Sequence, residues 1–144
     1  MFDEAFDFLD SVENTTYEVF RRGVNENSFI LEDGISEEQL FEKGIDGVGR
    51  KLPGYSPLTI SIKRSKGQPI DRTTLRDTGD FHRSITIKAS GDFIVVESDD
   101  PKAGDLIRRY GIDILKPTTE NIKDFYNDYI EEELRKEFND KITG

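Results

Sequence analysis

His82 is the one histidine of the chain and the first residue to consider for chemistry. It follows Asp80 and precedes Arg83, and a neighbouring carboxylate shifts an imidazole pKa toward the range of a general base. A nucleophilic enzyme would pair that base with a serine or a cysteine. The chain contains no cysteine, and no serine-based triad pattern surrounds His82. We therefore predict that there is no catalytic residue.

Carboxylates are abundant, with 30 aspartate and glutamate residues, but their spacing does not suit a metal site. Asp99, Asp100 and Asp105 lack the alternating ligands, central glycine and closing glutamate of a calcium loop. The glutamates at 131–133 are consecutive, so they fan out around a helix. The glycine-rich run 44–49 follows no strand and carries no phosphate-binding lysine. We expect neither a metal nor a cofactor.

Basic side chains gather in the middle of the chain. Residues 47–92 carry a net charge of +5, whereas residues 1–46 carry −10 and residues 119–144 carry −4. The overall charge of −10 argues against general binding to nucleic acid or to anionic membranes. Phosphate contact, contact with an acidic protein surface, and a solvated loop all remain open for the basic segment. The candidate subunit-interface residues are Lys63, Arg64, Lys66, Arg72, Arg76 and Arg83.

Helices are predicted where apolar residues recur at spacings of three and four. This pattern predicts a helix over 3–22 that stops at the next glycine, and a long amphipathic helix from 118 to 142. A capping-box pattern predicts a short helix over 36–43 that also ends at a glycine. A further short helix is expected over 102–110.

Strands are predicted where apolar and polar residues alternate. We expect a short strand over 28–32, a half-buried strand over 58–64 and a hairpin over 84–98 that turns at 90–92. The returning strand, 93–96, is expected to be more fully buried than its partner. Residues 65–79 form a long polar loop of a kind that is uncommon in compact domains, and we expect docking to order it.

The length of 144 residues suits a single domain, 1–144. The pattern predicts an α+β fold in which N-terminal and long C-terminal amphipathic helices pack on a small, mainly antiparallel sheet. The acidic N-terminal segment lacks the pattern of a signal peptide. No apolar stretch approaches the roughly 20 residues that a membrane span needs, so no membrane partner is expected.

The segment 55–87 carries the most distinctive motif. Asp77-Thr78-Gly79-Asp80 predicts a turn or cap in which side-chain oxygens accept from backbone N–H groups and Gly79 takes a positive φ. The motif is Leu-x-x-Thr-Gly-x-Phe/Leu-x-x-Ser-Ile, leading into a strand. Its positions in this chain are Leu75, Thr78, Gly79, Phe81, Ser84 and Ile85.

This motif resembles the minor virion and neck proteins of tailed bacteriophages, including the tail-completion, head–tail joining and virion-morphogenesis families. The runs 55–59 and 66–68 look like a version from phages and prophages of gut bacteria. The resemblance covers a quarter to a third of the chain. It implies a non-enzymatic subunit of a virion, assembled in the host cytoplasm. Copies would form a ring between portal or neck proteins and tail proteins, past which DNA moves without specific binding.

The charge pattern agrees with such a ring, because a basic segment and acidic ends on one chain suit a head-to-tail interface. Two other classes stay open. An acidic binding module, such as an inhibitor that mimics DNA, predicts a monomer with its carboxylates on one continuous face. An enzyme acting on the cell wall or on nucleic acid predicts a cleft in which carboxylates or His82 converge.

Overall fold

The computed structural model describes residues 2–91 and 93–143, with side chains from residue 10 onward. Helices dominate, and the sheet found in these residues is one antiparallel hairpin, so the α+β class is confirmed. In chain order the elements are α1 Phe2–Glu26, α2 Ser28–Asp33, the π-helical segment η1 Gly34–Lys43, α3 Pro57–Ser65, α4 Asp80–Ser84, β1 Ile85–Ser90, β2 Phe93–Ser98, α5 Ala103–Tyr110, the 3₁₀ turn η2 Ile112–Leu115, α6 Thr119–Tyr129 and α7 Glu131–Thr143.

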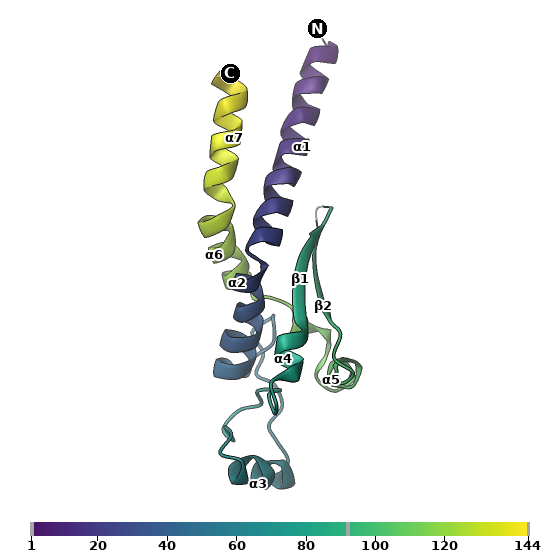
Figure 1. Ribbon diagram of the computed structural model, residues 1–144, viewed down its shortest axis with the longest axis vertical. Coiled ribbons are helices and arrows are strands. Elements are labelled where there is room, and N and C mark those ends of the chain that lie inside the picture. The colour runs from purple at the N-terminus through teal and green to yellow at the C-terminus, as the bar shows by residue number, and fades with distance from the viewer. Residues whose placement is uncertain (1, 92, 144) are drawn as a thin grey trace.

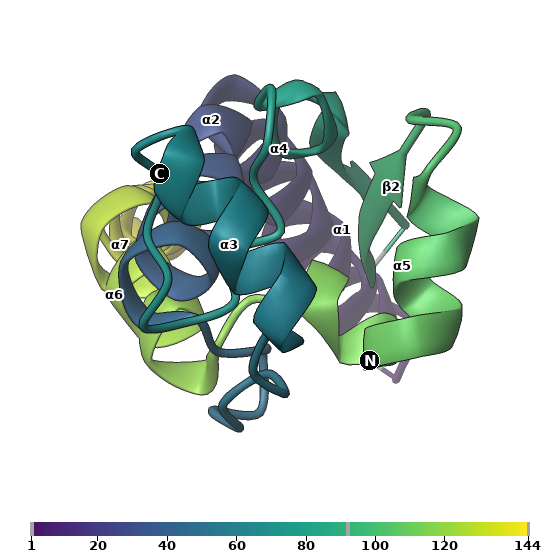
Figure 2. The same cartoon turned by 90° about the horizontal axis from the view of Figure 1, so that it is seen from below.

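The molecule is elongated (Figure 1). Helices α1 and α7 lie side by side and carry both termini at one end. The hairpin runs along α1, with β1 between α1 and β2. Helix α3 lies at the opposite end, held away from the body by its two connecting segments. Seen from below, the hairpin and α5 lie on one side of the molecule and α6 and α7 on the other (Figure 2).

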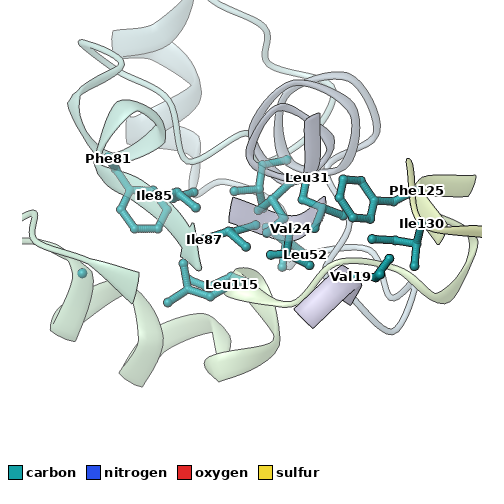
Figure 3. Close-up of a cluster of buried hydrophobic side chains, with 14 residues drawn as sticks. Val19, Val24, Leu31, Leu52, Phe81, Ile85, Ile87, Leu115, Phe125 and Ile130 are labelled. Atoms are coloured by element: carbon teal, nitrogen blue, oxygen red, sulfur yellow. The ribbon is translucent and has the colours of Figure 1, made fainter. Parts of the chain in front are cut away.

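The core forms where the apolar stripes of the helices meet the inner face of β1. Side chains of Val24 and Leu31 lie between Ile87 of β1 on one side and Phe125 and Ile130 on the other (Figure 3). Burying one such side chain stabilises the fold by about 1.5–3 kcal/mol. The buried cluster consists of Val19, Val24, Leu31, Ile35, Leu40, Leu52, Phe81, Ile85, Ile87, Ala103, Ile114, Leu115, Phe125 and Ile130.

Helix α1 was expected to stop at Gly23, and this prediction is wrong, because the helix continues to Glu26. A Cβ atom at Gly23 would lie 2.2 Å from Cδ1 of Ile130, at the junction of α6 and α7. The glycine therefore permits a close approach between α1 and Ile130 and does not terminate the helix.

Two predicted strands are helices. Residues 28–32 belong to α2, and residues 58–64 belong to α3. In α3 the Oγ of Ser56 accepts a hydrogen bond from the N–H of Thr59 at 3.2 Å, and Pro57 occupies the first turn. A serine cap followed by proline is a strong helix start. It overrides the short alternation of isoleucines that suggested a strand.

The predicted cap at Ser36 is also wrong. Helical structure runs on from α2 into η1, and the Oγ of Ser36 donates to the carbonyl of Glu32 at 3.0 Å, inside that run. The predicted end is confirmed: Gly44 has φ of 63°, the left-handed conformation that favours glycine.

The long C-terminal helix is divided in two. The Oγ1 of Thr118 accepts from the N–H of Asn121 at 3.2 Å, so the predicted cap is confirmed. The helix breaks at Ile130, which has φ of −118° and lies buried in the core. Helix α7 fully buries none of its side chains. Leu134 is partly buried against the core and Ile142 is 74% exposed, so the expected apolar face is only partly buried beyond the break.

The hairpin is confirmed, with β1 and β2 antiparallel and Ile85 paired with Ser98. The turn predicted at 90–92 includes Asp92, which lies outside the described residues. The prediction that residues 93–96 would be the more buried strand is wrong. Ile85 and Ile87 of β1 are buried, whereas Phe93 of β2 is 70% exposed, because α1 and α2 pack on β1.

Gln39 ties the two halves of the chain together. Its side chain is 1% exposed, although glutamine is a polar residue. The Nε2 atom donates to the carbonyl of Lys116 at 2.9 Å, and Oε1 accepts from the N–H of Thr118 at 2.9 Å and from Nδ2 of Asn121 at 3.1 Å. All the polar atoms of a buried amide are thus used, at the start of α6.

Replacing Gln39 by leucine keeps the side-chain volume but removes these three bonds. Because each buried group left without a partner costs about 1–3 kcal/mol, we expect Gln39→Leu to lower the free energy of unfolding by about 2–4 kcal/mol. Urea unfolding measures this change. The exposed neighbour Glu38 supplies the control, since Glu38→Gln should change stability by less than about 0.5 kcal/mol. Equal stability of the two variants would contradict the role of Gln39.

Candidate functional site

The segment 53–79 forms a lobe that projects from the body and carries α3 at its tip (Figure 1). Its base is pinned by buried threonines. The Oγ1 of Thr73 donates to the carbonyl of Pro53, and the Oη of Tyr55 accepts from the N–H of Thr74 at 2.8 Å. Thr73 and Thr74 are each 1% exposed, so the predicted loop 65–79 is anchored from within the chain.

The first half of the distinctive motif shapes the path from this lobe to the hairpin. Leu75 has φ of 55°, a left-handed conformation that is unusual for a leucine. The Oγ1 of Thr78 accepts from the N–H of Asp80 at 3.3 Å, and Gly79 has φ of 89° at the start of α4. The predicted turn with a positive φ at Gly79 is therefore confirmed.

The second half of the motif joins the fold core. Phe81 and Ile85 are 4% and 3% exposed, and both belong to the buried cluster. The Oγ of Ser84 donates to the carbonyl of Phe81 at 2.6 Å and lies 2.6 Å from Oγ of Ser98 on β2. These motif residues fix where α4 ends and the hairpin begins, so their direct role is structural.

Two of the six candidate basic residues lie on α3, three on the loop that follows it, and one on α4. Lys63 points inward: its Nζ donates to the carbonyl of Arg76 at 3.2 Å and lies 4.9 Å from the ring centroid of Tyr55. Lys66 forms an ion pair with Asp77 at 3.0 Å. In the described ranges the side chain of Arg64 forms no hydrogen bond or ion pair, and it is exposed.

The loop arginines bind η1. The Nε of Arg72 donates to the carbonyl of Phe41 at 2.7 Å. Arg76 lies over the ring of Phe41, 4.6 Å from its centroid, and its guanidinium is 3.6 Å from a carboxylate oxygen of Glu37. Arg83 on α4 pairs with Asp80. Five of the six basic residues thus have partners within the chain: Arg72 and Arg76 hold the lobe to η1, Lys63 and Lys66 bind within the lobe, and Arg83 pairs within α4.

Two carboxyl groups respond to these neighbours. The pKa of Asp77 is lowered, first by the hydrogen bond from the Gln68 amide and then by the bond from Lys66. The pKa of Asp80 is lowered by the Thr78 hydroxyl and by the Arg83 guanidinium. Both carboxylates are therefore held in the charged form, which suits a structural partner and not a proton donor.

His82 is 7% exposed and lies against the base of the lobe. Its Nε2 is 2.8 Å from the carbonyl of Thr74, which can only accept, so Nε2 carries the proton. Its Nδ1 is buried and has no hydrogen-bond partner among the described residues. Burial is the main cause that lowers the pKa of His82, and the positive charge of Arg76 lowers it further. The hydrogen bond to Thr74 and the negative charge of Glu37 act in the opposite direction. Asp80, the carboxylate considered as a partner for His82 in the sequence, pairs with Arg83 instead.

No three histidine, aspartate or glutamate side chains converge to hold a metal ion within residues 10–91 and 93–143. Among the helices that the structure describes, none has both the length and the apolarity needed to cross a membrane.

The exposed tip of the lobe is the feature that these internal contacts leave unexplained. Helix α3 has no buried residue. Leu58 is 71% exposed and Ile62 is 46% exposed, and they lie one helical turn apart on the same face. We call Leu58, Ile62 and Arg64 the α3 tip. Sequence analysis missed its apolar part because it assigned these residues to a half-buried strand.

An acidic groove lies between α1 and α7, away from the α3 tip. Two hollows of about 410 and 330 Å³ lie on this side of the molecule, the larger beside Gly23. Most of the charged residues that line the two hollows between α1 and α7 are carboxylates, and the two basic residues there are Arg22 and Lys141. We call these carboxylates the acidic seam: Glu18, Glu26, Asp128, Glu132, Glu133, Glu137 and Asp140.

Comparison of this chain with protein-family models, with curated proteins and with solved structures finds no match.

The lowered pKa of His82 sets the direction of a pH effect on stability. The ordinary pKa of 6.5 applies to the unfolded chain, which therefore binds a proton near that pH that the folded chain does not. Stability should fall as the pH drops from about 7.5 to about 5.5, a range above the ordinary carboxyl pKa values. The fall should be smaller in His82→Gln. Thermal unfolding at each pH measures both slopes, and identical slopes would exclude His82 as the cause.

Proposed function

We propose that this chain is a non-enzymatic structural subunit of a tailed-phage virion, at the neck or the tail top, where copies assemble into a ring. The α3 tip is the observation that carries the proposal. A nine-residue helix with no buried side chain is marginal by itself, and two exposed apolar residues on it favour a docking role. The resemblance of the motif in residues 75–85 to neck and tail-completion proteins supports the same conclusion.

The distribution of charge supports a head-to-tail contact between copies. Residues 57–68 contain no acidic residue, and of their three basic residues Arg64 has no partner in the described ranges. The acidic seam lies elsewhere on the molecule, so the α3 tip of one copy and the seam of the next are complementary. Two unlike surfaces of this kind make a heterologous contact, which closes into a ring when the rotation between copies permits. Neighbouring portal or neck proteins and tail proteins would meet the two sides of the ring.

The overall charge of −10 suits a position beside passing DNA, because repulsion prevents adhesion. The buried, neutral His82 and the paired carboxylates Asp77 and Asp80 offer no group poised for proton transfer, which supports a role without catalysis.

The α3 tip can be changed without disturbing the fold. We expect the double variant Leu58→Ser, Arg64→Glu to be excluded from particles by tenfold or more, because it removes an apolar anchor and reverses a charge. Its melting temperature should match that of the unmodified chain, since neither side chain has an intramolecular polar partner. Complementation of a phage that lacks this gene, followed by quantification in banded particles, measures incorporation.

The exposed residues Lys123 and Ile142 supply a matched control, because Lys123→Glu with Ile142→Ser makes equivalent changes far from the lobe. Normal incorporation of the α3 variant would contradict the proposed contact. Reversal of Arg72 or Arg76 is a poorer test, because those residues hold the lobe to Phe41 and Glu37.

The virion assignment itself is tested by mass spectrometry of banded particles. A low copy number, consistent with one ring per particle, would support a place in the neck or tail. Absence from clean particles would remove the structural role and favour the acidic binding module, which should then bind a basic host protein as a monomer.

A further inference from the structure

The outer edge of β2 is an unpaired strand edge. In an antiparallel pair, directly opposed residues either exchange both hydrogen bonds or exchange none. The N–H groups of Ile87 and Ala89 on β1 donate outward, to Oε1 of Glu32 at 3.0 Å and to Oδ1 of Asn25 at 2.9 Å. These two residues therefore belong to pairs that exchange no hydrogen bond.

The partners of Ile87 and Ala89 on β2 are Val96 and Ile94. The backbone groups of Val96 and Ile94 must therefore also point away from the hairpin, on its other side. In the described part of the chain, no protein group pairs with them. Figure 1 shows β1 between α1 and β2, with α5 at the lower end of β2.

Among the described residues, the outward backbone N–H groups thus have side-chain acceptors on the β1 edge of the hairpin but not on the β2 edge. Asn25 and Glu32 close the edge of β1. Natural sheets protect an exposed edge with lysine, proline, a bulge or a covering element, because an open edge pairs with other chains. At Ile94 and Val96 the edge of β2 has none of these devices.

An apolar groove of about 350 Å³ runs beside this open edge. Ile94 and Val96 line one side, and Ile112, Leu115 and Ile122 from η2 and α6 line the other. Ile112 is 63% exposed and Ile122 is 38% exposed, so the groove is accessible. A strand added to β2 would place every second side chain over this groove.

We propose that the free protein dimerises by pairing β2 with β2 of a second copy, antiparallel about a two-fold axis at Val96. The edge of β2 and the groove beside it form a self-complementary surface, because each copy supplies both an apolar groove and the branched side chains of Ile94 and Val96. Pairing Val96 with Val96 places Ile94 opposite Ser98 and Glu97 opposite Val95. No carboxylate then faces another carboxylate directly, and two marginal hairpins become one four-stranded sheet.

This contact is separate from the proposed ring contact. It is isologous, closes with two copies and uses β2, whereas the ring contact is heterologous and uses the α3 tip. Each can therefore fail without the other.

The natural absence of cysteine permits a direct test with single-cysteine variants. Two residues that exchange hydrogen bonds across antiparallel strands have Cα atoms about 5.5 Å apart. We expect Val96→Cys to give a covalent dimer with a short bis-maleimide at least tenfold faster than Thr86→Cys, which places the thiol on β1 of the same hairpin. Light scattering of the unmodified chain should show its mass rising toward that of a dimer as concentration increases.

A proline at position 96 provides a second test of the proposed β2 pairing. Because the N–H of Val96 bonds to nothing within the hairpin, Val96→Pro removes an edge donor without breaking the ladder. We expect this variant to keep its circular dichroism spectrum and remain monomeric, whereas Glu97→Gln remains a dimer. A second variant, Ile94→Lys, places a charge in the groove and should also be monomeric. A monomer at all concentrations, or equal cross-linking of the Val96→Cys and Thr86→Cys variants, would overturn the proposal.

Discussion

The buried amide of Gln39 is the contact on which the arrangement of the two halves depends. It lies in η1 and holds the backbone of Lys116 and Thr118, 77 and 79 residues further along the chain. Amide geometry leaves little freedom, because a carbonyl can only accept and an N–H can only donate. The position of η1 relative to the start of α6 is therefore fixed by direction as well as by distance.

The same element also positions the lobe. Glu37 and Phe41 flank Gln39 in η1, and they hold Arg76 and Arg72 of the lobe. One short helical segment thus contacts the C-terminal half through its buried side and the lobe through its exposed side. Of the basic residues that first suggested an intermolecular surface, two are used for this contact and three have other partners within the chain. What remains for a partner is the α3 tip, where the apolar residues are exposed and Arg64 is unpaired among the described residues.

Local signals in the sequence predicted the elements that local chemistry decides. The hairpin, α5, the Thr118 cap and the positive φ at Gly79 all follow from a few adjacent residues. The errors arise where a distant contact decides. Gly23 looks like a helix stop until Ile130 is known to pack on it, and the periodicity after residue 118 does not reveal the break at Ile130. The isoleucines of α3 fit a strand and a helix equally, and the cap at Ser56 decides between them. Of the candidate site, sequence placed the basic residues but not their partners.

The two proposed contacts between copies should respond to salt in opposite directions. The α3 tip and the acidic seam attract through unlike charges, which added salt screens over a Debye length of about 8 Å at physiological ionic strength. Pairing through β2 relies on backbone hydrogen bonds and apolar burial, while two chains that each carry −10 repel one another. Salt screens this repulsion, so it favours the β2 contact at the expense of the α3 contact. Of the two proposed associations, one would depend on attraction between charges and the other would form in spite of repulsion. Ionic strength is the variable that separates them.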